Sequence, residues 1–169
     1  AEGLLSGIML DTRDFTLHTG VRTFEAAAFL RRNGADVTRV RKLFRENAAE
    51  YKAKADAVSQ AEIYRNAYAI SICHSEGIAS PTVVGAQAAN ELLDIRGVKA
   101  SFVLTEYQNK LFFSARSIDE VNVQVIMERM GGGGLLNIAG CQLENTSVEE
   151  GIIVLKRTLD KMIEEGEIS

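Results

Sequence analysis

The chain has 169 residues, of which 46% are hydrophobic and 25% charged, and its formal net charge at pH 7 is -4. This length suffices for a substantial core, while the acidic balance excludes a positive field over the whole surface, so any contact with nucleic acid must be local. No apolar run of membrane-spanning length and no signal peptide occurs in the sequence, which predicts no membrane contact by this part of the chain.

The first part of the chain is expected to hold one buried strand followed by helices. The apolar run Gly7–Leu10 directly precedes Asp11, which is typical of a strand with a polar residue at its carboxyl end. Apolar residues at helical spacing predict helices over 23–32 and 37–44. Residues 45–61 contain neither Pro nor Gly, and we expect them to form a helix that joins two lobes.

The rest of the chain alternates strand and helix patterns, which predicts a second, mixed α/β domain. Two Ser-x-x-Glu capping boxes, at Ser117 and Ser147, predict helices that end at Met130 and near Gly166. The remaining predicted elements are strands over 68–72, 98–105 and 111–114, the last two forming a hairpin, and a helix over 81–95. A truncated parallel sheet before residue 45 would expose an edge, so the native protein is expected to continue upstream of Ala1.

Four consecutive glycines are the clearest candidate for a binding site. Gly131, Gly132, Gly133 and Gly134 can adopt backbone angles closed to other residues, so their N–H groups could form a concave anion nest. Arg116 would add a charged fork, and the amide of Asn122 could donate to phosphate or sugar oxygens. The alternative is that the glycines only terminate a helix, although one glycine would suffice for that.

Other candidate groups give weaker signals. Asp11 is the leading metal ligand, although a strand-end aspartate is as often a cap, and His18 and His74 lie in different segments. The basic residues between Arg31 and Arg45 are typical of a solvated helical face. The two cysteines have no paired spacing, which favours reduced thiols and argues against a zinc site.

Taken together, several motifs resemble the DHH phosphoesterases, and most closely the membrane-bound cyclic-di-AMP phosphodiesterases of bacteria. The resemblance spans nearly the whole chain. The motifs that carry it are Gly7–Thr12, Phe15–Leu17, Thr19–Ala27, Ser114–Ser117, Val121–Gln124 and Met127–Gly134.

The resemblance implies three parts, an α/β fold and a two-lobed site. Residues 1–34 would be the end of a parallel-sheet catalytic DHH domain, 35–61 the connecting helices, and 62–169 a mixed-sheet DHH-associated domain. Asp11 would correspond to the last aspartate that ligates manganese. The substrate's phosphate and nucleoside parts would be held by Ser114, Arg116, Ser117 and the four glycines.

The implied activity is manganese-dependent hydrolysis of cyclic-di-AMP to a linear dinucleotide, and this chain departs from that pattern in two ways. The Asp-x-Asp and Asp-His-His motifs, which supply most metal ligands in the family, would lie upstream of Ala1. We therefore expect no turnover and weak nucleotide binding from this chain alone. In addition, Leu135 follows the glycines where the family usually has histidine.

The resemblance leaves other functions open. One alternative is a DHH exonuclease that trims short oligonucleotides, and another is a noncatalytic nucleic-acid-binding module. The implied partners are a cyclic dinucleotide or short oligonucleotide and an upstream DHH domain in the same polypeptide, and the family is compatible with a homodimer. The implied location is the cytoplasmic side of the cell membrane, to which the parent protein would be anchored.

Overall fold

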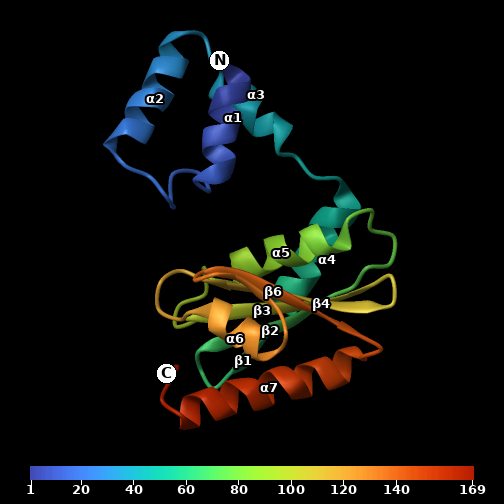
Figure 1. Ribbon diagram of the computed structural model, residues 1–169. Coiled ribbons are helices and arrows are strands. Elements are labelled where there is room, and N and C mark those ends of the chain that lie inside the picture. Colours follow the sequence, from blue (N-terminus) through green and yellow to red (C-terminus); the bar gives the residue numbers. More distant parts are fainter. The chain divides into compact units, whose positions relative to one another are not determined.

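The computed structural model describes residues 1–169 and divides them into two compact units (Figure 1). The first unit comprises Ala1–Glu46 and the second Asn47–Ser169. Each unit has a hydrophobic core of its own. No helix in either unit combines the length and the apolar character needed to cross a membrane.

The first unit is helical throughout, so the predicted strand at Gly7–Leu10 is wrong. Its helices are α1 (Glu2–Asp11), α2 (Val21–Arg32) and α3 (Val37–Leu43). Leu5 is buried, and Ile8 and Met9 pack on the same small core, which is helical rather than alternating spacing. Asp11 is therefore the last residue of a helix and does not stand at the end of a strand.

The second unit is a mixed α/β domain, as the sequence predicts. Its six-stranded sheet has the order β1-β2-β3-β4-β6-β5, in which β2 and β3 are parallel and all other neighbours are antiparallel. The strands are β1 (Glu62–Tyr64), β2 (Tyr68–Cys73), β3 (Ala100–Tyr107), β4 (Lys110–Ser117), β5 (Gly133–Leu135) and β6 (Ile138–Glu144). The helices are α4 (Ala48–Ser59), α5 (Pro81–Leu92), α6 (Val123–Arg129) and α7 (Val148–Glu164).

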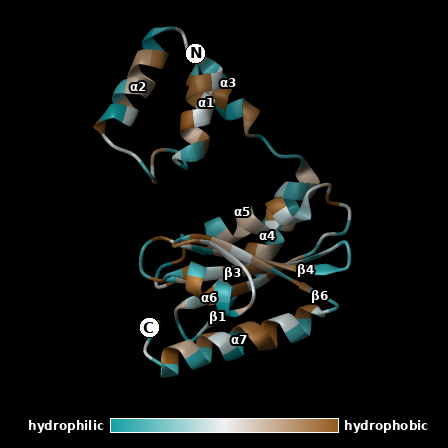
Figure 2. Cartoon of the chain, in the orientation of Figure 1, coloured by the Kyte–Doolittle hydropathy of each residue, from teal (hydrophilic) through white to brown (hydrophobic).

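Helices cover both faces of this sheet, which gives three layers (Figure 1). One core joins α4 and α5 to one face and includes Ala57, Leu92 and Val103. The other core joins α6 and α7 to the opposite face and includes Met127 and Leu159. Figure 2 shows hydrophobic and hydrophilic residues alternating along α7, as expected of a helix with one buried face.

The two predicted capping boxes had different outcomes. Ser147 caps α7 as predicted, because its hydroxyl accepts from Glu150 N while the Glu150 carboxylate accepts from Ser147 N. The box at Ser117 is wrong, since Ser117 is the last residue of β4 and pairs with Ala100. Helix α6 instead begins after Asn122, whose side-chain oxygen accepts from Gln124 N. Pairing and burial in the sheet outweigh the local capping pattern.

The predicted connecting helices, 35–61, are divided between the units. Helix α3 packs within the first unit and α4 within the second, and the boundary falls after Glu46. The division into parts 1–34, 35–61 and 62–169 stays a prediction about evolutionary domains, which packing alone does not test.

Candidate functional site

Strand β4 carries three of the predicted binding residues, and its alternation separates them. Ser114 pairs with Val103 and Arg116 with Ser101, so both point to the sheet face that carries α4 and α5. Ser117 lies one residue out of step, points to the opposite face and is buried. The structure therefore brings Ser114 and Arg116 together and separates Ser117 from them.

The register of three strands extends this arrangement into two rows across the sheet. The first row contains Gly133, Gly140 and Ser114, and the second contains Leu135, Ile138 and Arg116. We call these six residues the open face, because each of them is half-buried or exposed although the strands belong to a folded sheet. In the first row, only Ser114 has a side chain, so its hydroxyl lies beside two positions at which only the backbone is present.

The glycine run performs two separate structural tasks. The amide of Gly131 donates to Glu128 O and that of Gly132 to Met127 O, and Gly131 has a φ of 85°. These bonds end α6 in the manner of a glycine C-terminal cap. The concave nest formed by all four N–H groups is therefore wrong, because two of the four amides are already committed to the helix.

The next glycines let β5 lie close to β6. A Cβ atom on Gly132 would overlap the Gly140 carbonyl oxygen, and one on Gly134 would overlap the Ile138 carbonyl oxygen. At Gly133, by contrast, an added Cβ would meet no atom within 4 Å. Of the four glycines, only Gly133 thus combines open space above it with a backbone conformation that other residues adopt.

Arg116 supplies the positive charge of the open face. Its Nη1 atom donates to Ala115 O at 2.8 Å and to Ala139 O at 3.4 Å, which holds the guanidinium against β4 and β6. A guanidinium fixed in this way is a suitable group for recognising carboxylate or phosphate oxygens.

Asn122 has a structural role that sequence reasoning missed. It is the N-terminal cap of α6, and the following residue, Val123, donates its N–H to Leu136 O. Asn122 therefore lies beside the turn between β5 and β6. Gly140 and Ile138 were missed as site residues, although a glycine within the apolar strand pattern of β6 is a signal for close backbone approach.

Cys141 lies beneath the glycine run and is an unsuitable nucleophile. It is 8% exposed, and its Cα would lie 2.7 Å from a Cβ added to Gly132. Burial raises the pKa of its thiol to about 12, so the thiolate is not formed near neutral pH.

The predicted metal ligand Asp11 is not part of a cluster of potential metal ligands within this chain. Asp11 is exposed at the end of α1, and no group of three or more His, Cys, Asp or Glu side chains is placed to bind a metal ion. Asp11 can offer one carboxylate, whereas a divalent metal site in a hydrolase needs several ligands.

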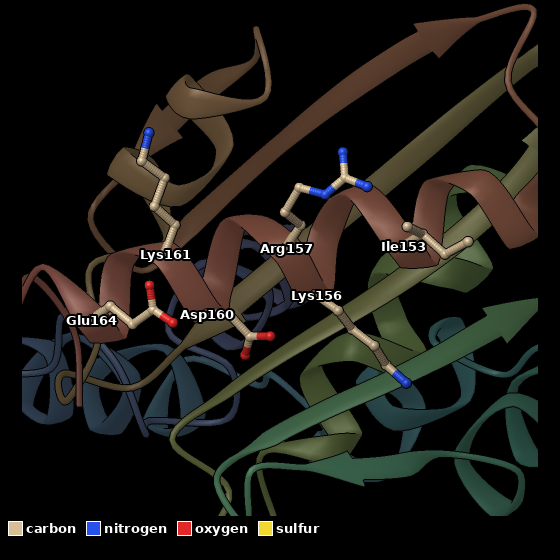
Figure 3. Close-up of a pocket in the computed structure, with 6 residues that line it drawn as sticks. All are labelled: Ile153, Lys156, Arg157, Asp160, Lys161 and Glu164. Carbon is tan, nitrogen blue, oxygen red and sulfur yellow. The ribbon is translucent and has the colours of Figure 1, made fainter.

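A surface depression of about 670 Å³ lies elsewhere, along the outer side of α7 (Figure 3). All six residues that line it come from this one helix. Lys156 is paired with Glu62, and Asp160 accepts from Tyr64 and Arg65. These pairs connect α7 to β1 and to the turn after it, which gives Lys156 and Asp160 a structural role.

The sequence comparisons agree with this architecture. The family model of the DHHA1 domain matches residues 66–165. The chain belongs to the DHHA1 domain family. The matched residues comprise strands β2 to β6 and helices α5 to α7, while β1 lies just before them, and the resemblance inferred from the sequence motifs is confirmed.

Two bacterial proteins are similar over most of the chain. Cyclic-di-AMP phosphodiesterase PdeA of Listeria monocytogenes is 46% identical over 151 residues, which cover 89% of this chain and 23% of PdeA. Cyclic-di-AMP phosphodiesterase GdpP of Geobacillus thermodenitrificans is 42% identical over 167 residues, which cover 98% of this chain and 25% of GdpP. The chain with its DHHA1 domain thus spans about a quarter of the length of these relatives.

A solved structure supports the fold. An exopolyphosphatase-related protein from Bacteroides fragilis matches 92% of this chain and 48% of its own length, with a TM-score of 0.81 and 21% sequence identity. At this identity the match extends to the fold of the DHHA1 domain and not to its ligand.

Proposed function

We propose that this chain is the substrate-binding part of a phosphodiesterase that hydrolyses cyclic-di-AMP to a linear dinucleotide. The observation that carries the proposal is the open face, in which register places Arg116, Ser114 and Gly133 together on one side of the sheet. The names of the two similar proteins support the choice of cyclic-di-AMP as substrate.

Each of these three residues has a distinct role in the proposed complex. The Arg116 guanidinium pairs with a phosphate of the substrate, and the Ser114 hydroxyl donates to a second oxygen of the same group. Gly133 lets the phosphate approach the backbone, since no side chain stands above it. Ser117, Asn122, Gly131, Gly132 and Gly134 support the site by shaping β4, α6 and β5.

Hydrolysis belongs to the whole protein in this proposal. Asp11 offers a single carboxylate to manganese, and the remaining ligands would come from a DHH domain in the same polypeptide. The chain alone therefore binds manganese weakly and turns over no substrate. Calorimetry with manganese tests this, and strong binding by the chain alone would contradict it.

We also propose that the parent protein is anchored in the cell membrane with this part on the cytoplasmic side. The likeness of its motifs to the membrane-bound phosphodiesterases supports this location. Fractionation of cells that express the parent protein, followed by protease treatment of sealed vesicles, tests both the anchoring and the side.

The open face is tested by a graded series at Gly133. Because a Cβ atom added there meets no atom within 4 Å and points into open space, Gly133→Ala, Gly133→Val and Gly133→Leu should leave the unfolding temperature nearly unchanged. Binding of cyclic-di-AMP, measured by calorimetry, should weaken progressively and by at least about tenfold for leucine, or about 1.4 kcal/mol. Gln142→Leu, at an exposed position two residues beyond Gly140 in β6, is the control for added bulk.

Unchanged binding across the glycine series would show that the substrate does not contact this face. Assays of the parent protein with cyclic-di-AMP and with short RNA separate the cyclic-dinucleotide phosphodiesterase from an exonuclease. Steeply salt-dependent RNA binding without hydrolysis would favour the nucleic-acid-binding module instead.

A further inference from the structure

Leu135 is an apolar side chain in an exposed position at the edge of the open face. It is 66% exposed, it ends β5, and it stands in the same row as Ile138 and Arg116. A leucine with this exposure gains little stability from the fold itself, because most of its surface stays in water.

The position of Leu135 relative to Arg116 limits what could cover it. Leu135 and Arg116 are two strand spacings apart, or roughly 10 Å between Cα atoms. The glycine row runs alongside, so no side chain stands at Gly133 or Gly140. A ligand with an anionic group at Arg116 and a flat apolar part directed toward β5 would therefore lie over Ile138, alongside the two glycines, and reach Leu135.

We propose that Leu135, together with Ile138, contacts the nucleobase of the bound dinucleotide and makes affinity depend on the presence of a base. This inference rests on the proposed function and assigns the second half of the same ligand. Leucine has no hydrogen-bonding group, so the contact follows the apolar area of the base and not its pattern of donors and acceptors.

The experiment compares two ligands that differ only in the bases. Calorimetry measures the affinity of the chain for the linear dinucleotide 5′-pApA and for its abasic counterpart, which keeps both phosphates and sugars. Leu135→Ala should weaken binding of 5′-pApA about tenfold, the scale for loss of apolar contact in a pocket, and leave binding of the abasic ligand unchanged. Leu135→Met should restore binding to within about twofold, because methionine replaces most of the lost apolar area.

Leu136→Ala provides a matched control. Leu136 is the adjacent leucine and is 51% exposed, but it lies in the turn after β5, outside the row that contains Arg116. Its truncation should change both affinities by less than about twofold, since it removes the same atoms from a site without ligand contact.

The outcomes separate this inference from the proposed function. If the unsubstituted chain bound both ligands equally well, or if Leu135→Ala weakened both to the same extent, the base contact would be refuted while phosphate binding stood. If the unsubstituted chain bound neither ligand, the proposed function would fail and the base contact with it.

Discussion

Ser114 on β4 and Gly140 on β6 lie directly opposite each other, and Gly133 on β5 continues the same row. A serine hydroxyl therefore borders two neighbouring positions that have no side chain. On the opposite face of the sheet, the paired residues Phe102 and Ala115 are instead buried in the core beneath α6 and α7. The contrast shows that side chains do not fill this part of the sheet, as the proposed binding of a phosphate there requires.

Substitutions at the adjacent glycines Gly132 and Gly133 should have very different effects on stability. Gly132→Ala places a Cβ against the Gly140 carbonyl oxygen, and we expect it to lower the free energy of unfolding by about 2 kcal/mol or more. Gly133→Ala has open space and should change that free energy by less than about 0.5 kcal/mol. Urea titration followed by circular dichroism measures both, and equal effects would contradict the β5–β6 register.

Removing the guanidinium of Arg116 should weaken nucleotide binding, whereas removing an exposed arginine outside the open face should not. Charge-assisted hydrogen bonds of this kind contribute about 1.5–3 kcal/mol, so Arg116→Ala should lower affinity for cyclic-di-AMP by roughly 10- to 100-fold. Arg116→Lys should recover only part of the loss, because lysine cannot form the two-pronged contact. Arg96→Ala, at an exposed arginine between α5 and β3, is the matched control and should leave affinity unchanged.

The buried Cys141 thiol should make stability depend on alkaline pH. Its pKa is raised to about 12 in the folded chain from an ordinary value of 9.0, so the unfolded thiol ionises first as pH rises. Stability linked to this group is complete below pH 9 and is lost between about pH 9 and 12, by up to about 1.4 kcal/mol per pH unit.

Comparison with Cys141→Ala isolates this effect from the titration of other groups. The unsubstituted chain should lose more stability between pH 8 and pH 10 than the variant, as measured by urea unfolding at each pH. Parallel curves for the two proteins would mean that Cys141 is not protected by the fold.

The capping box of α7 offers a test of local helix energetics. Ser147→Ala removes the acceptor for Glu150 N and should lower the free energy of unfolding by about 1 kcal/mol. Ser147→Asp keeps an acceptor at this position and should be nearly neutral. Thermal unfolding distinguishes the two, and a loss with aspartate equal to that with alanine would argue against the cap.

The sequence predicted those elements whose signals are local. The Ser147 box, the hairpin between β3 and β4 and the proline at the start of α5 each depend on residues within a few positions of one another. Such signals predict the structure correctly because the interactions that they describe are made between residues close together in the sequence.

The errors occurred where contacts distant in sequence decide the structure. Gly7–Leu10 is too short an apolar run to distinguish a strand from a helix, and the packing of Leu5 against Leu30 and Val40 identifies the helix. Ser117 has the sequence of a helix cap but is paired with Ala100 in the sheet.

The arrangement of the candidate binding residues could be predicted only in part, and their role in binding stays a prediction. The motifs pointed to Ser114, Arg116 and the glycines, but only strand register could reveal that Ser117 faces the other side. The position of Gly140 between Ser114 and Gly133 was hidden for the same reason, because Gly140 lies on a strand that follows the glycine run in the sequence.

Strand β5 is expected to open more readily than the other strands of the proposed site. This strand has three residues, lies at the edge of the sheet and is hydrogen-bonded to β6 alone. Short edge strands open at lower free energy than central ones, so amide hydrogen exchange in β5 should be faster than in β4. A ligand that spans Arg116 and Leu135 would bridge the stable interior of the sheet to its least stable strand, and would thereby act as an additional cross-link that closes the edge.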